Sequence, residues 1–321
     1  MDRRDFVRAA GGCAAHLALA SAALPAFARR AWAQQARFRT VAQEPWGRLE
    51  AVAEGVWALV STPLDGDRTT LCNGGIVVGR SGVMVVEAFA SDTGARWMAA
   101  QAKALTGRAP THVVVTHYHA DHAAGIRGTF DTADVVLLAT TETRDTAAAR
   151  NREAPVELLQ RARPLDAQAP TAIDLGGRRV TLVPRDGHTR SDVSVHVTEP
   201  RVTFCGDLVW NGMFPNYVDA IPSRLSASVR ALREAGAATY VPGHGGLATP
   251  AELDRFIEVI DLVEAVARRA HAAGTPAAEA AKTFALPPAL GEWRMFSANY
   301  FERAIGAWLR ELGGPAAPGA A

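Results

Sequence analysis

Lysine is scarce in this 321-residue chain, and its net charge is close to zero. Lys103 and Lys282 are the only lysines, so arginine carries almost all of the positive charge. Lysine plus arginine number 34 and aspartate plus glutamate number 33, which gives a formal net charge of +1. Proteins that bind a polyanion usually carry a clustered basic excess. The composition therefore gives no electrostatic argument for nucleic acid as a partner.

Cysteine is also scarce, with only Cys13, Cys72 and Cys205. Small scaffolds held together by disulfides need many more cysteines than this. The chain is instead long enough to bury a large hydrophobic core, since 48% of its residues are hydrophobic and 21% are charged. We therefore expect an ordinary globular protein of one or two domains.

Long hydrophobic runs are missing as well. Residues 9–28 are weakly apolar, but glycines, a histidine and a proline interrupt them, which disfavours a membrane-spanning helix. The preceding residues 2–8, with the sequence DRRDFVR, resemble a twin-arginine export signal. Small-x-small cleavage sites follow at residues 26–28 and 31–33.

We therefore expect residues 1–33 to be a removable export signal. The mature protein would be periplasmic or otherwise exported, with no stable membrane insertion after cleavage. Cleavage there removes five arginines and two aspartates, and so lowers the formal net charge from +1 to −2.

Strand-like and helix-like segments alternate after the leader, which predicts an α/β fold. β-Branched runs predict strands at 52–60, 75–78, 83–86, 113–115, 180–183, 193–197, 202–205 and 239–241. Apolar spacing predicts helices at 94–105, 223–234, 250–272 and 297–312, and a polar, helix-rich excursion at 141–163. Residues 61–70 are expected to form a mobile hairpin loop.

One catalytic domain is expected at residues 37–270. Residues 271–312 would add a C-terminal helical extension, and the Gly/Pro/Ala-rich residues 313–321 would be a disordered tail.

The most informative segment is the hexapeptide at residues 117–122, which reads His-Tyr-His-Ala-Asp-His. It follows the predicted strand at 113–115, at the carboxyl end where α/β proteins place their ligands. Imidazole nitrogens and carboxylate oxygens are the donors that bind zinc and related divalent ions. The hexapeptide therefore predicts a metal site, whereas His16, His112, His196 and His271 are expected to be ordinary surface or core residues.

The hexapeptide resembles the His-x-His-x-Asp-His signature of the metallo-β-lactamase superfamily. Three later segments resemble the remaining motifs of that family in the same order: Gly187-His188-Thr189, Cys205-Gly206-Asp207 and Pro242-Gly243-His244-Gly245. The resemblance covers about residues 45–265. It implies a sandwich of two mixed β-sheets packed face to face, with helices outside.

The resemblance also implies a dinuclear metal centre and its ligands. One metal would be bound by His117, His119 and His188, the second by Asp121, His122 and His244, and Asp207 would bridge the two. Two Zn²⁺ ions suit these nitrogen and oxygen donors, although iron or manganese is not excluded. Such a pair activates water for attack on an acyl carbon. Asp121 would also orient that water.

The resemblance leaves the reaction open among several branches of the family. The general expectation is hydrolysis of an ester, thioester, lactone or β-lactam bond in a small acyl-type substrate. Residues 187–219 resemble a β-lactamase subclass, but Asp207 stands where that subclass has cysteine, and Trp210 stands where it has a substrate-binding lysine. Neither Arg190 nor Arg224 lies at the matching position. His122 with an aspartate bridge resembles the glyoxalase II and lactonase branches, and a mononuclear iron, persulfide dioxygenase-like oxidoreductase is a further alternative.

Two further interpretations concern residues close to the predicted ligands. Glu87 stands where the family usually has aspartate, and it would either support the metal loop or form an ordinary surface pair. Cys72 and Cys205 would lie in different sheets as two buried thiols. Cys205 is expected to point to the same side of its strand as Asp207.

A cluster of apolar residues follows the predicted bridging ligand: Trp210, Met213, Phe214, Pro215 and Tyr217. This cluster either lines a substrate groove, facing a loop around Leu64 and Asp65, or packs against the C-terminal helices. In the first case Asn216 would donate a hydrogen bond to a developing oxyanion. The sequence leaves the substrate and the oligomeric state undetermined.

Overall fold

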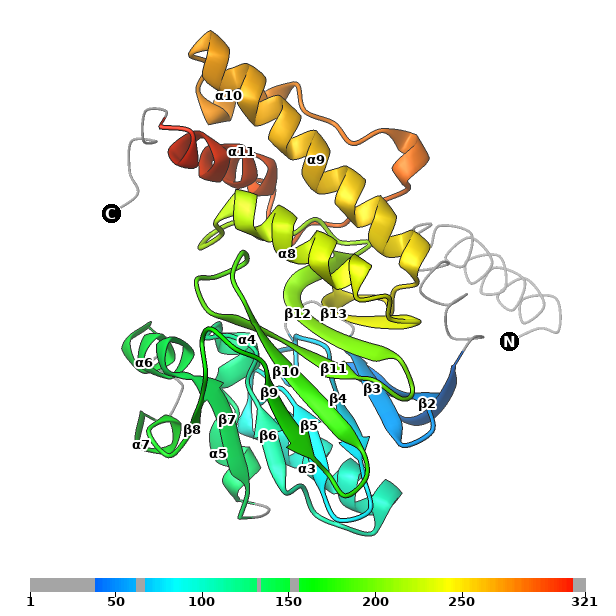
Figure 1. Ribbon diagram of the computed structural model, residues 1–321. Helices are drawn as coiled ribbons and strands as arrows, with labels where there is room; N and C mark the ends of the chain where they lie inside the picture. The colour runs from blue at the N-terminus through cyan, green and yellow to red at the C-terminus, as the bar shows by residue number, and fades with distance from the viewer. Residues whose placement is uncertain (1–37, 62–66, 132–133, 151–155, 314–321) are drawn as a thin grey trace, which may run out of the picture.

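The computed structural model describes residues 38–61, 67–131, 134–150 and 156–313. Two β-sheets pack face to face, and helices cover the outer face of each (Figure 1). The predicted fold class, an αββα sandwich with additional C-terminal helices, is confirmed. The expected leader, the centre of the loop at 61–70 and the tail from residue 314 lie outside the described residues.

The larger sheet has eight strands in sequence order, from β1 to β8. Its first five strands pair antiparallel and its last four pair parallel, with β5 shared between the two parts. The strands are β1 Arg39–Glu44, β2 Gly47–Ala53, β3 Val56–Ser61, β4 Gly74–Val78, β5 Val83–Val86, β6 His112–Val114, β7 Val136–Thr140 and β8 Arg163–Leu165.

The smaller sheet has five strands in the order β13-β12-β11-β10-β9. All neighbours pair antiparallel except β12 and β13, which run parallel. The strands are β9 Thr171–Asp174, β10 Arg179–Arg185, β11 Asp192–Val197, β12 Val202–Asn211 and β13 Thr239–Gly245. β12 is six residues longer than predicted, because its second half continues to pair with β13.

Apolar side chains from both sheets form the core between them. Val86 and Val114 contribute from the larger sheet, and Val195 and Phe204 from the smaller. This continuous apolar contact fixes the two sheets against each other. Loops at one edge of both sheets are thereby brought together.

Helices on the larger sheet surround the predicted metal loop. They are α3 Asp92–Thr106, α4 Ala120–Ala123, α5 Ile126–Phe130, α6 Thr141–Arg150 and α7 Val156–Leu159. The Ser91 side chain caps α3 by accepting a hydrogen bond from the Gly94 backbone, and Gly107 ends the helix in a left-handed conformation. These end signals explain why the helix predicted at 94–105 forms.

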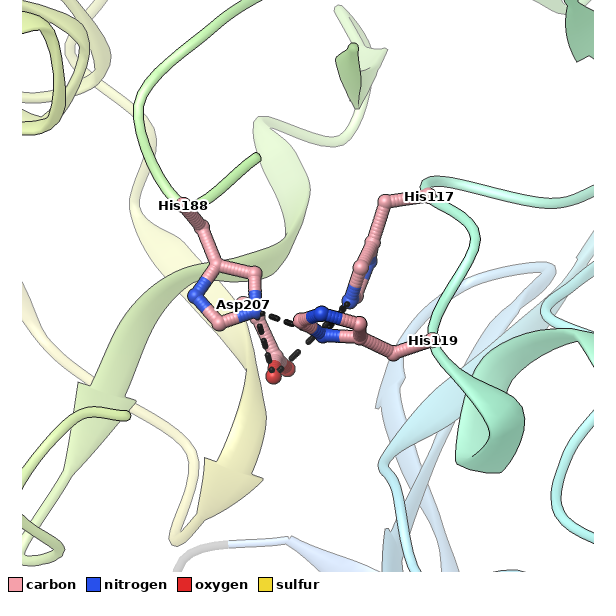
Figure 2. Close-up of side chains that lie close together, drawn as sticks. All are labelled: His117, His119, His188 and Asp207. Carbon is pink, nitrogen blue, oxygen red and sulfur yellow. Dashed lines mark hydrogen bonds and ion pairs between the residues drawn. The ribbon is translucent and has the colours of Figure 1, made fainter. Parts of the chain in front are cut away.

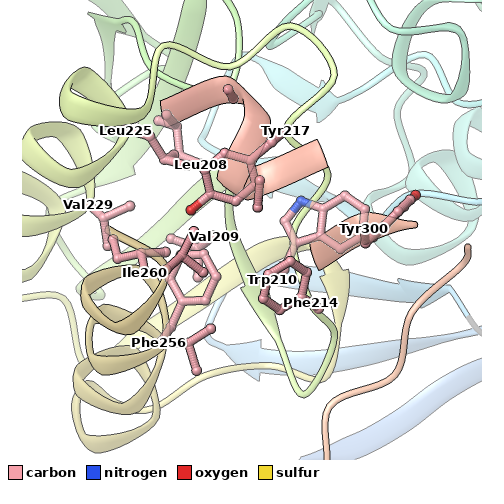
Figure 3. Packing of buried hydrophobic residues seen from close by; sticks show 14 of the residues in the cluster. Leu208, Val209, Trp210, Phe214, Tyr217, Leu225, Val229, Phe256, Ile260 and Tyr300 are labelled. Atoms are coloured by element: carbon pink, nitrogen blue, oxygen red, sulfur yellow. The ribbon is translucent and has the colours of Figure 1, made fainter. Parts of the chain in front are cut away.

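Helices on the smaller sheet form the other outer layer. They are α8 Pro222–Glu234, α9 Pro250–Ala273, α10 Ala277–Lys282 and α11 Tyr300–Glu311, with a short 3₁₀ helix at Pro288–Leu290. Thr249 and Glu252 form a reciprocal capping box at the start of α9. Phe256 and Ile260 of α9 pack with Val229 of α8 onto β12 (Figure 3). Within the described residues, no helix has the length and apolarity that crossing a membrane requires.

The strand predicted at residues 52–60 is wrong as a single element. Gly55 adopts φ +68°, and the chain turns there to form the β2–β3 hairpin. A left-handed glycine between two apolar runs is a turn signal, so the hydrophobic pattern alone misled the prediction.

Candidate metal centre

The hexapeptide lies where β6 ends in the middle of the larger sheet. The backbone leaves the strand after Val114, and His119 becomes the N-cap residue of α4. The helical turn then orients Asp121 and His122. The buried side chains of His117 and His122 are 0% exposed. A short strand–turn–helix segment thus directs four possible ligands into one small region.

The first donor group joins the two sheets. His119 Nδ1 lies 3.1 Å from His117 Nε2 and 2.9 Å from His188 Nε2. Asp207 Oδ2 lies 3.3 Å from His188 Nε2. The four donor atoms all fall within 4.8 Å of one another, and Figure 2 shows the side chains converging from opposite sides. The two histidines of the loop therefore meet partners from the smaller sheet.

The second donor group comprises Asp121, His122 and His244. Asp121 Oδ2 lies 3.1 Å from His244 Nε2 and 3.6 Å from His122 Nε2. These three donors also fall within 4.8 Å of one another. The structure therefore gathers all seven predicted ligands into two adjacent groups.

Asp207 stands between the two groups. Its Oδ2 faces His188, whereas its Oδ1 lies 3.1 Å from His122 Nε2 and 3.4 Å from His244 Nε2. Gly243 makes this placement possible, because a Cβ atom there would lie 1.9 Å from Asp207 Oδ1. One carboxylate thus offers one oxygen to each group, as a bridging ligand would.

The chemistry of the buried donors fits divalent cations. His122 Nε2 and Asp207 Oδ1 are buried and lie 3.1 Å apart, but neither makes a hydrogen bond of good geometry within the described residues. Unpartnered buried polar atoms are costly, and bound cations would satisfy them. Burial lowers the pKa of His117 well below its ordinary value and that of His188 to about 3. Both rings are therefore neutral, which is the form that binds metal.

Asp219 holds the ring of His119 from the side away from the donor group. Its Oδ2 lies 3.1 Å from His119 Nε2, and this hydrogen bond keeps the pKa of Asp219 well below its ordinary value. Arg150 donates to the other oxygen of Asp219 at 2.9 Å. The sequence analysis missed this role, although Asp219 lies in the segment that resembles the β-lactamase asparagine loop.

Glu87 supports the metal loop through two neighbours. Its carboxylate accepts hydrogen bonds from the Thr116 hydroxyl at 2.6 Å and the Thr116 backbone at 3.2 Å, and it lies 3.1 Å from His122 Nδ1. The residue is only 2% exposed. The alternative of a surface pair is therefore wrong.

Cys72 and Cys205 are both free and buried, as predicted. The Cys72 thiol donates to the Asp121 backbone oxygen at 3.0 Å and so supports the loop. Cys205 packs in the apolar cluster under α8 and α9, whereas Asp207 faces the donor groups. The prediction that both point to one side is wrong, because Gly206 at φ +52° lies in an irregular part of β12 and breaks the alternation.

A pocket of about 410 Å³ lies elsewhere, among α9, α10 and the segment that follows them, whereas one of about 360 Å³ opens onto the donor groups. The second pocket is lined by Leu71, His119, Ala120, Asp121, Asp207, Trp210, Asn216, Val218, His244, Phe296 and Tyr300. Asn216 is thus at the site, and its Oδ1 accepts a hydrogen bond from the Val218 backbone at 3.2 Å. Leu64 and Asp65, predicted to face this region, lie outside the described residues.

The two interpretations of the apolar cluster each hold for part of it. Trp210 lines the pocket, with its ring 4.2 Å from that of His244. Phe214 is fully buried, and its ring lies 4.8 Å from that of Phe301. Figure 3 shows Trp210 beside Tyr300 of the C-terminal helices, 6.5 Å from its ring. Trp210 therefore forms a wall, while Phe214 packs the loop against the extension.

The sequence of this chain matches a known family. Residues 67–244 match the sequence profile described as the metallo-beta-lactamase superfamily. The chain therefore belongs to the metallo-beta-lactamase superfamily.

Among curated proteins, the human protein named acyl-coenzyme A thioesterase MBLAC2 is 30% identical over 143 residues, or 39% of this chain. The match spans 50% of that protein, so the chain covers half the length of this relative.

Solved structures support the fold. A metallo-beta-lactamase from Erythrobacter litoralis superposes with a TM-score of 0.58 at 22% identity, covering 68% of this chain and 98% of that one. A metallo-beta-lactamase from Pontibacter korlensis gives a TM-score of 0.57 at 19% identity, covering 67% and 99%. At these identities the likeness concerns the architecture alone.

Proposed function

We propose that this protein is a metal-dependent hydrolase that cleaves an acyl-type bond with water activated by two divalent cations, zinc by preference. The observation that carries the proposal is the position of Asp207. Its two carboxylate oxygens face two separate groups of imidazole and carboxylate donors. A pair of cations rather than a single one suits this arrangement.

The seven donor residues form two sets of cation ligands. His117, His119 and His188 would bind one cation with Asp207 Oδ2, and Asp121, His122 and His244 the other with Asp207 Oδ1. Such a pair supplies a water of lowered pKa and stabilises the anion that develops on the acyl group.

Two side chains at the pocket would act on the reacting groups themselves. Asp121 lines the pocket, so its carboxylate would accept a hydrogen bond from the attacking water and direct it. Asn216 lies at the same pocket, with its carbonyl oxygen occupied by the Val218 backbone. Its amide Nδ2 would donate to the acyl oxygen.

Among acyl bonds we place the thioester first, because the curated relative is named a thioesterase. The lactone and ester remain within the proposal. A β-lactamase is less favoured, since Trp210 occupies the position of the substrate-binding lysine in the subclass that this segment resembles. A mononuclear iron, persulfide dioxygenase-like enzyme would not need His122 and His244, both of which complete a second donor group here.

The test is a panel of chromogenic thioester, ester, lactone and β-lactam substrates with the zinc-loaded protein, with and without chelator. We expect hydrolysis of at least one acyl substrate, loss of activity with chelator, and two metal ions per chain by elemental analysis. Asp207→Ala and His119→Ala should each abolish turnover. Full activity in either variant, or one bound iron and no hydrolysis, would overturn the proposal.

We also propose that the protein is exported through its twin-arginine-like residues 2–8. The support is the sequence of that segment. Replacing Arg3 and Arg4 by lysine should retain the protein in the cytoplasm in a fractionation experiment, whereas unchanged export would exclude this route.

A further inference from the structure

The pocket above the donor groups has two chemically different parts. Its floor carries His119, Asp121, Asp207 and His244, which belong to the metal centre. Its walls are apolar or aromatic: Leu71, Trp210, Val218, Phe296 and Tyr300. Neither lysine nor arginine is among the described residues that line it.

The C-terminal extension supplies the outer wall. The Arg294 backbone pairs with the loop after β12, donating to the Gly212 oxygen at 3.1 Å and accepting from the Phe214 nitrogen at 2.7 Å. Two residues later the Phe296 ring lies 5.6 Å from the ring of His244. Main-chain pairing therefore holds Phe296 at the mouth of the pocket.

Trp210 joins this wall to the metal centre. Its ring lies 5.8 Å from the ring of Phe296 and 6.5 Å from that of Tyr300, and it also lies 4.2 Å from the ring of His244. A substrate that reaches the metal centre thus passes between aromatic side chains from β12 and from the extension.

Two large apolar side chains at this pocket are exposed to solvent. Phe296 is 46% exposed and Val218 is 48% exposed. A single exposed apolar residue is ordinary, but two at the mouth of one pocket mark a surface that an apolar ligand would cover.

We infer that this site selects an apolar, straight-chain acyl group, which the wall of Trp210, Val218 and Phe296 covers. The inference rests on the proposed hydrolase function, because the acyl carbon must reach the metal centre. In the thioester case the water oxygen bonds to the acyl carbon and the carbon–sulfur bond breaks, which releases a carboxylic acid and a thiol.

The first experiment measures binding without turnover. Straight-chain thioethers, in which a methylene replaces the thioester carbonyl, cannot be hydrolysed, and calorimetry on the zinc-loaded full chain gives their affinities. Between two and eight carbons, we expect about two- to fourfold tighter binding per added methylene, as burial of a methylene group provides.

Variants then assign this dependence to the wall. Phe296→Ala should flatten the dependence on chain length, whereas Phe296→Leu, which keeps an apolar side chain, should preserve most of it. Met295→Ala is the matched control, because Met295 is the adjacent residue, is 40% exposed and does not line the pocket. It should behave as the unmodified protein.

The outcomes separate this inference from the hydrolase proposal. Chain-length-dependent binding with no hydrolysis of any acyl substrate would support the selectivity and overturn the proposed reaction. Hydrolysis with no dependence on chain length would overturn the selectivity and leave the reaction standing. An equal loss in Met295→Ala and Phe296→Ala would overturn the assignment to the wall.

Discussion

Oδ2 of Asp219 lies 3.1 Å from Nε2 of His119, although the two residues are 100 positions apart in the chain. The other nitrogen of the same ring, Nδ1, faces His117 and His188. A carboxylate that accepts from one ring nitrogen fixes the orientation of the imidazole and keeps the opposite nitrogen available for a metal.

Asp219→Ala should therefore weaken the metal centre while leaving every ligand in place. We expect losses of about 10- to 100-fold in zinc affinity and in kcat/KM, measured by competition with a chromogenic chelator and by steady-state kinetics. Arg150→Ala is the control, because it removes only the exposed partner of Asp219. Unchanged zinc affinity in Asp219→Ala would refute the orienting role.

Removal of metal should lower the stability of the fold. His122 Nε2 and Asp207 Oδ1 are buried 3.1 Å apart without a hydrogen bond of good geometry, so bound cations would satisfy them better than they satisfy each other. Zinc present at 100 times its Kd should stabilise the folded state by about 2.7 kcal/mol for each occupied site. Thermal unfolding with and without chelator measures this difference, and Asp207→Ala should show a much smaller one. An identical Tm with and without chelator would contradict the prediction.

Phe214→Ala should reduce stability and not catalysis. Its side chain is fully buried against Phe301 and Tyr217 and does not line the pocket. We expect a loss of about 3–5 kcal/mol in the free energy of unfolding, as truncation of buried phenylalanine usually gives. Urea denaturation measures the loss, and kcat/KM at a temperature where the variant stays folded should remain close to that of the unmodified protein. A large fall in kcat/KM would instead place Phe214 in the substrate groove.

Asn216→Ala should show the opposite behaviour. The side chain is only partly buried, and its Oδ1 interacts with the Val218 backbone. We expect a change of about 0.5 kcal/mol or less in stability together with a fall of about 100-fold in kcat, the effect of removing one oxyanion donor. An unchanged rate would leave Asn216 with a structural role alone.

Acid should destabilise the fold partly through His196. Burial, reinforced by the charge of Arg185, lowers the pKa of His196 to about 4, and its ring nitrogens lie near the hydroxyls of Ser194 and Thr203. Between pH 6.5 and 4 the unfolded chain binds a proton that the folded chain does not bind. The free energy of unfolding therefore falls as the pH falls through this window.

The contribution of His196 reaches at most about 3 kcal/mol at the acid end of the window, since each unit of pKa shift corresponds to about 1.4 kcal/mol. Urea denaturation from pH 7.5 to 4.5 measures it on metal-free protein, so that pH-dependent loss of metal does not contribute. His196→Asn should show a shallower slope with pH. Equal slopes in the two proteins would refute this assignment.

Local spacing was sufficient for the sequence to predict part of the site. Within residues 117–122, a strand end followed by a turn brings His117 and His119 to one donor group. A single helical turn then brings Asp121 and His122 to the second group. The motif resemblance then identified His188, Asp207 and His244 as candidate partners, and the same resemblance implied the layered fold.

Two features were decided by the tertiary structure. Glu87 is buried against Thr116 and His122 because the neighbouring strand ends beside the metal loop. Cys205 faces away from Asp207 because β12 is irregular at Gly206, where a Cβ would lie 2.8 Å from the Thr116 hydroxyl oxygen. Periodicity along one strand carries no information about such contacts between strands.

The amino-acid sequence by itself determined which side chains can bind metal and the local geometry of the loop that carries four of them. Only the folded chain decided that Asp219 holds His119 and that Phe296 of the extension faces His244. The physical reason is the distance along the chain over which each effect acts. Ligand chemistry and helical or strand spacing act over a few residues, whereas these pairings arise when two sheets and the C-terminal helices pack together.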